Sequence, residues 1–255
     1  MVGSLWRTLF LVMCVATSAW GALSQIREPQ SVDAAFSDEN SHTAVSPAPR
    51  KPDFNQDIYY KDKLELSLEN GWLPINIPFV YNFLTGDTYT KWPLSYTLAP
   101  NIASLRWQID HIDGPSVLRG NGEFSFSFTY TDIPRGPETR YFAFDFGIRR
   151  NFVPRSWRVA PYFEMRGGVG NINAKGPDGI LYAQGQDLTF TYMMGSGARY
   201  NFSPRFSVAS GLTYMHVSNG GLSNPKVTNF GINVYGPIVG FYARIGKAKP
   251  SSIAH

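Results

Sequence analysis

A histidine and a serine two positions apart near the end of this 255-residue sequence are the pair best suited to chemistry. His216 and Ser218 lie where larger apolar residues alternate with small or polar ones, and such alternation predicts a strand that presents both side chains on one face. A serine hydroxyl within hydrogen-bond reach of an imidazole is a nucleophile with its base. For an isolated His-x-Ser, an interfacial histidine followed by the start of a loop would be the better interpretation.

Strands that could position this pair run through most of the chain from Lys63 onward. The alternation predicts eight strands, at 63–72, 94–109, 122–132, 140–151, 158–170, 187–201, 205–217 and 231–246. Several exceed the ordinary length of about five or six residues and reach the roughly ten residues that a tilted strand needs to cross a bilayer. Two matching Asn-Phe-x-Pro-Arg turns, at 151–155 and 201–205, predict an up-and-down meander with short turns at one end.

The alternation alone leaves open which face of the strands points outward. A lipocalin-like soluble barrel would turn its aromatic face inward, whereas an outer-membrane barrel would turn it toward lipid. Lysine is missing from 92–174 and from 176–225, and a solvated wall would be expected to carry it. The sequence therefore predicts an all-β fold, an eight-stranded antiparallel transmembrane β-barrel of the outer-membrane type.

The second face of the predicted strands carries Ser, Thr, Gly, Ala and a few charged residues. We interpret the charged residues as an ion network inside the barrel; they are Asp145, Arg149, Arg158, Glu164, Arg166 and Arg199. Tryptophans would mark the membrane interfaces, with Trp72 and Trp92 toward one rim and Trp107 and Trp157 toward the other. An even strand number puts both termini on one side. That side, with the two short turns, is predicted to be periplasmic, and the longer connections at 73–93, 133–139, 171–186 and 218–230 are predicted to face outward.

The N-terminal part of the sequence has a different character. Residues 1–21 carry Arg7, an apolar run and the motif Ala-Trp-Gly, which predict a signal peptide. The alternative, a membrane anchor, is weaker because the apolar run is shorter than the roughly 20 residues that span a bilayer. Residues 22–58 are polar and aperiodic and predict a disordered leader, followed by the barrel at 59–248 and a tail at 249–255. The single cysteine, Cys14, falls in the signal peptide, so the mature chain would have no disulfide.

Composition excludes several classes of function. The net charge of +4 is mild and no basic cluster or nucleic-acid motif occurs, so no nucleic-acid partner is predicted. His42, His111 and His255 are placed too far from His216 to share a metal with it, and no glycine-rich phosphate loop opens a helix. The prediction is therefore an absence of metal and of cofactor, while the oligomeric state stays open.

The string His216-Val-Ser-Asn-Gly-Gly-Leu222, followed by Asn229-Phe-Gly-Ile-Asn233, resembles the PagL-type outer-membrane lipid A 3-O-deacylases, the acyloxyacyl hydrolase family. The resemblance implies an integral outer-membrane enzyme, a serine esterase that hydrolyses an ester-linked acyl chain of lipid A in lipopolysaccharide, without a cofactor. It implies Ser218 as nucleophile, His216 as general base, and Asn219 with the backbone N–H of Gly221 as oxyanion donors.

Asn233 is the departure from that resemblance, because the better known family pattern has a glutamate there. Asn233 has the parity of Tyr235 and Phe241, which predicts that it shares a face with His216 and Ser218. An asparagine oxygen can accept the imidazole N–H and fix the tautomer, but it cannot offset the imidazolium charge, so slower chemistry is expected. The alternatives to the enzyme are a non-enzymatic small barrel that stabilises the membrane or binds a partner through its loops, and a lipocalin-like carrier.

Overall fold

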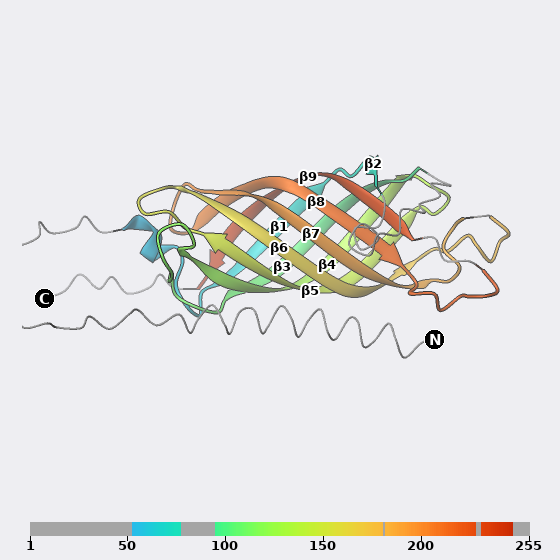
Figure 1. Ribbon diagram of the computed structural model, residues 1–255, viewed down its shortest axis with the longest axis horizontal. Coiled ribbons are helices and arrows are strands. Elements are labelled where there is room, and N and C mark those ends of the chain that lie inside the picture. Colours follow the sequence, from blue (N-terminus) through green and yellow to red (C-terminus); the bar gives the residue numbers. More distant parts are fainter. Residues whose placement is uncertain (1–52, 78–94, 181, 228–230, 247–255) are drawn as a thin grey trace, which may run out of the picture. The chain divides into compact units, whose positions relative to one another are not determined.

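The computed structural model describes residues 53–77, 95–180, 182–227 and 231–246. After a short 3-10 helix, η1 (Phe54–Asp57), nine strands follow along the chain (Figure 1). They are β1 (Leu64–Gly71), β2 (Ile75–Asn76), β3 (Thr97–Gln108), β4 (Gly120–Arg135), β5 (Arg140–Phe152), β6 (Val159–Ile172), β7 (Leu188–Asn201), β8 (Phe206–Ser218) and β9 (Ile232–Ile245). Each of the eight predicted strands corresponds to one long strand of the structure, with ends that differ by a few residues.

Eight of these strands close into an antiparallel barrel. Each long strand pairs with its neighbour in the chain, and β1 pairs with β9 to complete the ring. The two-residue β2 also pairs with β9, at Tyr235 and Val234, and so extends the β1 side of the ring beyond Gly71. The eight-stranded up-and-down barrel is therefore confirmed. Within the described residues, no helix is long and apolar enough to cross a membrane.

The outer wall of the barrel is aromatic and apolar, as the predicted face assignment requires. On β4 and β5, residues such as Phe126, Phe128, Phe144 and Phe146 point outward and are exposed, while the residues between them are buried. The Phe126 and Phe144 rings stack with their centroids 6.0 Å apart. A continuous exposed apolar surface of this kind fits contact with lipid rather than water.

Buried ion pairs fill one half of the barrel interior. Arg106 contacts Glu69, Glu123 and Glu164 at 2.9, 2.6 and 3.0 Å, and Arg199 contacts Glu65 at 2.6 Å. Such charges are tolerated inside a protein only when they are paired and hydrogen-bonded. The pairing therefore makes a charged interior compatible with a closed, filled barrel.

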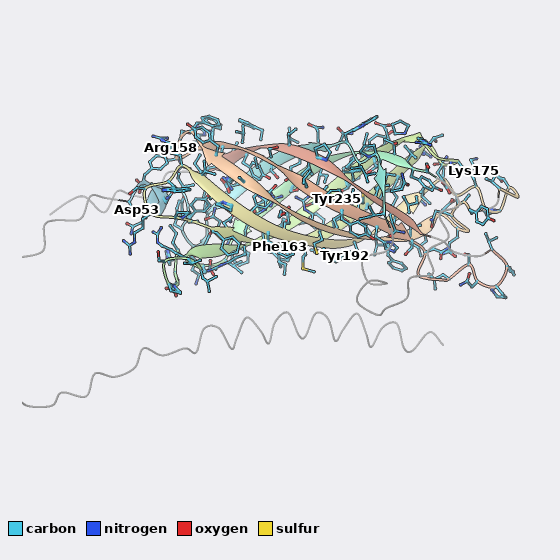
Figure 2. The ribbon with its side chains drawn as sticks, turned by 45° about the horizontal axis from the view of Figure 1, so that its top comes forward. Asp53, Arg158, Phe163, Lys175, Tyr192 and Tyr235 are labelled. Atoms are coloured by element: carbon cyan, nitrogen blue, oxygen red, sulfur yellow. The ribbon has the colours of Figure 1, made fainter. Side chains whose placement is uncertain are left out.

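The predicted ion network is correct for four of its six residues. Arg149, Glu164, Arg166 and Arg199 take part in it. Asp145 also points inward, but it accepts the Thr129 hydroxyl at 2.6 Å. Arg158 is outside the network, because it lies at the end of the barrel near Asp53 (Figure 2) and donates to the carbonyls of Asn201 and Phe202.

The prediction from the sequence did not include most of the acidic residues of this network. Glu65 and Glu69 come from β1, where Leu64, Leu66 and Leu68 point outward and the residues between them point inward. The same period-two alternation that identified the other strands could have assigned them. The remaining missed members are Lys63, Arg106 and Glu123.

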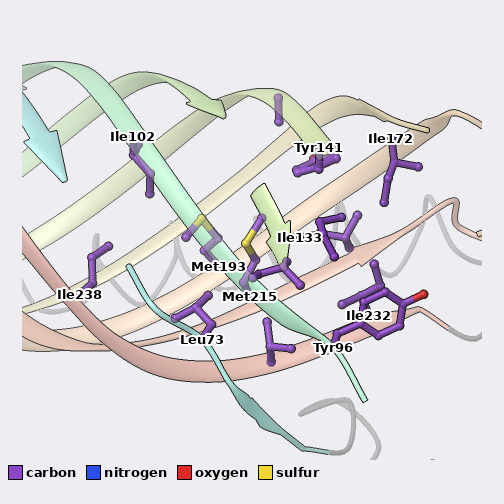
Figure 3. Packing of buried hydrophobic residues seen from close by; sticks show 14 residues of the cluster. Leu73, Tyr96, Ile102, Ile133, Tyr141, Ile172, Met193, Met215, Ile232 and Ile238 are labelled. Atoms are coloured by element: carbon purple, nitrogen blue, oxygen red, sulfur yellow. The ribbon is translucent and has the colours of Figure 1, made fainter. Parts of the chain in front are cut away.

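A cluster of buried apolar residues lies in the other half of the barrel interior (Figure 3). Its cluster includes Met193, Met215, Val217, Ile232 and Val234, from the ends of β7, β8 and β9 nearest Ser218. Met215, Val217 and Val234 are fully buried. The inner side of this part of the wall is therefore packed with side chains, and groups on its outer side can be reached only from outside the barrel.

The predicted disordered leader extends too far along the chain. Residues 53–58 are folded: η1 is capped by the Asp53 side chain, and the buried Asn55 side chain donates to the carbonyls of Pro154 and Trp157 at 2.9 and 3.0 Å. Ile58 is also buried. The segment is folded despite its polar composition, because the Asn55 amide satisfies two turn carbonyls. The predictions for residues 1–52, for Trp92 and for the tail after 246 lie outside the described residues.

Short connections were predicted at one end of the barrel and long connections at the other, and two connections depart from this prediction. β4 continues to Arg135, so the connection to β5 is only 136–139 instead of 133–139. At the opposite end, β3 and β4 are joined by the longer segment 109–119. The assignment of the two ends to the periplasm and the outside stays a prediction.

Candidate active site

The register of β8 and β9 brings His216 directly opposite Asn233. Ser218 is the last residue of β8 and follows two positions after His216 on the same outward face. On the other side of β8, Tyr192 of β7 is the partner of His216. Three consecutive strands therefore hold the outer face on which the predicted nucleophile, base and orienting residue meet.

Hydrogen bonds connect these three side chains in a row. His216 Nε2 lies 2.8 Å from Ser218 Oγ, and His216 Nδ1 lies 2.8 Å from Asn233 Oδ1. Because Asn233 Oδ1 can only accept, Nδ1 carries the imidazole proton and Nε2 accepts from the serine hydroxyl. This is the tautomer that a general base for Ser218 requires.

Tyr214 is a member of the site that sequence reasoning missed. Its hydroxyl donates to Asn233 Oδ1 at 2.6 Å, so that oxygen accepts from both Tyr214 and His216. The side chain is only 2% exposed although it points to the outer face, and its ring meets Tyr192 edge-on at 6.5 Å. The parity of Tyr214 with His216 was visible in the sequence, but its reach across to Asn233 was not.

Gly231 lies against the imidazole, just before β9. A Cβ built on it would come 2.9 Å from His216 Cε1, and its φ of +67° favours glycine. Any side chain here would push on the histidine ring. The glycine therefore allows the chain to enter β9 in contact with His216.

The predicted oxyanion donors bond to one another in this structure. Asn219 is fully buried; its Oδ1 accepts from the Gly221 N–H at 2.9 Å, and its Nδ2 donates to Ser223 Oγ at 2.7 Å. Gly220 and Gly221 both have positive φ, so the chain turns tightly after the nucleophile. To serve as oxyanion donors, the Gly221 N–H would have to leave Asn219 Oδ1, and Asn219 would have to use the Nδ2 hydrogen that does not bond to Ser223.

The electrostatic character of the site follows from its neutral partners. No Asp or Glu occurs after Asp187 in the sequence, so the residues that flank His216 on β8 and β9 supply no carboxylate. Ser218 is 9% exposed and His216 is half-buried. The arrangement can activate a serine for attack on an ester, with an amide in place of the usual carboxylate.

Comparison with known proteins assigns the chain to a family. No curated protein matches the chain. Among solved structures, the crystal structure of the outer membrane enzyme PagL is 19% identical, with a TM-score of 0.44 over 71% of this chain and 99% of that chain. Neisserial surface protein A is 10% identical, with a TM-score of 0.45 over 72% and 96% of the two chains. The family model described as lipid A 3-O-deacylase (PagL) matches residues 101–242. This segment is more than half of the sequence and contains the whole row from Ser218 to Asn233, and the chain accordingly belongs to the lipid A 3-O-deacylase (PagL) family.

Proposed function

We propose that this protein is a serine esterase of the outer membrane that hydrolyses the ester-linked 3-position acyl chain of lipid A. The observation that carries the proposal is the row of hydrogen bonds from Ser218 through His216 to Asn233, at 2.8 Å each. Membership of the lipid A 3-O-deacylase family supports the substrate class. The predicted signal peptide and the apolar outer wall support the location.

The position of the row on the barrel fits a lipid substrate. Ser218 and His216 are on the outward face of β8, and Leu212 and Val208 on the same face are exposed apolar residues. Behind them the interior is filled by Met215 and Val217. An acyl ester could therefore reach Ser218 laterally from the leaflet, whereas a solute passing through the barrel could not.

The chemistry would proceed in two halves. Ser218 Oγ attacks the ester carbonyl carbon while its proton passes to His216 Nε2. When the tetrahedral intermediate collapses, the bond to the sugar oxygen breaks, and His216 returns the proton to that oxygen. Water then attacks the acyl-enzyme, again with His216 as base, and releases the fatty acid and the free Ser218 hydroxyl.

Asn233 would hold the imidazole in the required tautomer through both halves. It stabilises the imidazolium less than a carboxylate would, which predicts a slower enzyme than one with an acidic residue at this position. Asn219 and Gly221 remain the predicted oxyanion donors. They could act once the Gly221 N–H is released from Asn219 Oδ1 and the second Nδ2 hydrogen of Asn219, the one not bonded to Ser223, points to the substrate oxygen.

Mass spectrometry of lipid A tests the proposal. Lipid A would be extracted from cells that express the wild-type chain, the Ser218→Ala variant or neither. The expected result is loss of one 3-hydroxyacyl group in the wild-type sample alone. An unchanged lipid A profile in all three samples, with folded protein present in the membrane, would contradict the proposed function.

A further inference from the structure

The segment that follows the nucleophile is held by a chain of side-chain contacts. Ser223 Oγ accepts from Asn219 Nδ2 at 2.7 Å and donates to the Val227 carbonyl at 2.7 Å. The backbone bonds Leu222 N–H to Asn219 O and Val227 N–H to Ser223 O close the same turn. One hydroxyl thus connects the residue after Ser218 to the far side of the loop.

The β6–β7 connection, at 173–187, packs against this hydroxyl. A Cβ built on Gly185 would come 2.6 Å from Ser223 Cβ and 3.0 Å from Val227 Cβ, and still closer to Ser223 Oγ. A Cβ on Gly176 would lie 2.8 Å from Val227 Cγ1. The backbone of one loop therefore touches the side chains of the other, and glycine is needed at both contacts.

A buried carboxylate anchors the β6–β7 connection in turn. Glu138, in the β4–β5 turn, is fully buried; it accepts the Gln184 N–H at 2.6 Å and the Tyr96 hydroxyl at 2.7 Å. Burial and the neighbouring Glu138 carboxylate raise the pKa of Tyr96, so its hydroxyl stays a donor. The position of Gly185, next to Gln184, is fixed by this anchor.

We propose that Ser223, braced by the β6–β7 connection at Gly185, is a positioning residue that keeps Ser218 in line with His216 for attack. The inference rests on the proposed function, because it assigns Ser223 to the same nucleophile. Without the Ser223 hydroxyl, Asn219 loses a hydrogen-bond partner inside a buried turn. A buried group that loses its partner is expected to reorient. Ser218, one residue earlier, would then spend less time in hydrogen-bond contact with the imidazole.

Two variants test the brace from its two sides. Ser223→Ala removes the hydroxyl, and Gly185→Ala leaves the hydroxyl in place but pushes the two loops apart. Each is expected to lower kcat by about tenfold, the effect of roughly one buried hydrogen bond, with KM within about twofold of wild type. The matched control is Ser210→Ala, on the exposed outer face of β8, the strand that also carries Ser218. This variant should retain wild-type kcat.

The rate at which a fluorophosphonate probe labels Ser218 separates positioning from a role in binding lipid. A positioning role lowers the labelling rate by the same factor as kcat, whereas a role in binding lipid would leave labelling unchanged. The heat-modifiable gel band reports the folded fraction, which should match wild type. Wild-type labelling in folded Ser223→Ala overturns the inference; if that variant does not fold, Gly185→Ala decides in the same way. Deacylation that survives in Ser218→Ala would instead overturn the proposed function.

Discussion

His216 Nδ1 and Asn233 Oδ1 lie 2.8 Å apart across the β8–β9 pair, where the two residues are direct partners in the register. The contact orients the imidazole so that Nε2, the nitrogen without a proton, faces Ser218. In the proposed mechanism, a carboxylate at position 233 would both orient the imidazole and offset its positive charge, whereas Asn233 only orients it. Asn233→Ala is expected to reduce kcat by about tenfold or more and to leave residual turnover. The measurement is the deacylation rate of purified lipid A in detergent micelles.

Asn233→Asp tests whether a negative charge at this position speeds the reaction. The aspartate has nearly the same shape and adds the charge that offsets the imidazolium, so kcat is expected to rise severalfold over wild type. The same assay measures it, with heat-modifiability as the check on folding. A rate below that of Asn233→Ala would show that charge at this position does not assist the reaction.

Ser218→Ala and His216→Ala are each expected to abolish deacylation while the barrel stays folded. Both residues lie at the end of β8 on the outer face, and neither fills the interior cluster. Because they would act as one unit, the double variant should be hardly slower than either single variant. Additive losses in the double variant would argue against a shared proton transfer.

Tyr214→Phe removes the second donor to Asn233 Oδ1 and keeps the ring packing. The loss of one hydrogen bond of about 1 kcal/mol predicts a fall in kcat of about fivefold. Tyr192→Phe is the matched control, because the Tyr192 hydroxyl contacts Met194 Sδ and not Ser218, His216 or Asn233. Equal effects of the two variants would assign Tyr214 to packing alone.

Gly231→Ala is expected to damage activity more than stability. The added methyl would meet His216 Cε1, and the ring would have to turn away from Ser218 or Asn233. We expect kcat to fall at least tenfold, since small displacements of a catalytic group are costly. Gly179→Ala, where a Cβ meets nothing within 4 Å and φ is likewise positive, controls for backbone strain.

Glu164→Gln should destabilise the barrel without touching the site. Glu164 pairs with Arg106, Arg149 and Arg166 inside the barrel, and breaking a buried ion pair from one side costs about 3–5 kcal/mol. Urea unfolding in micelles, followed by gel mobility, should show the loss. Asp178→Asn, in an exposed pair with Lys175, should change stability by less than about 1 kcal/mol.

The sequence by itself determined the strands, their faces and the shared face of His216 and Ser218, the candidate catalytic pair. Period-two alternation encodes which side of a strand each residue occupies, so the outward Phe128 and Phe144 and the shared face of His216 and Ser218 could be predicted. The choice of Asn233 as the candidate third member needed the resemblance, because parity gives a face and not a partner.

The tertiary structure alone decided which residues on different strands meet. The β8–β9 register sets His216 against Asn233, and a slip of one residue would have turned the partner inward. The contacts of Tyr214 with Asn233 and of Gly185 with Ser223 likewise depend on pairing and loop packing between separate segments. The folded segment at Asn55 was missed for the same reason: its two carbonyl acceptors lie about a hundred residues away, at Pro154 and Trp157. Local patterns report the face of a strand, whereas contacts between distant segments form only when the barrel closes.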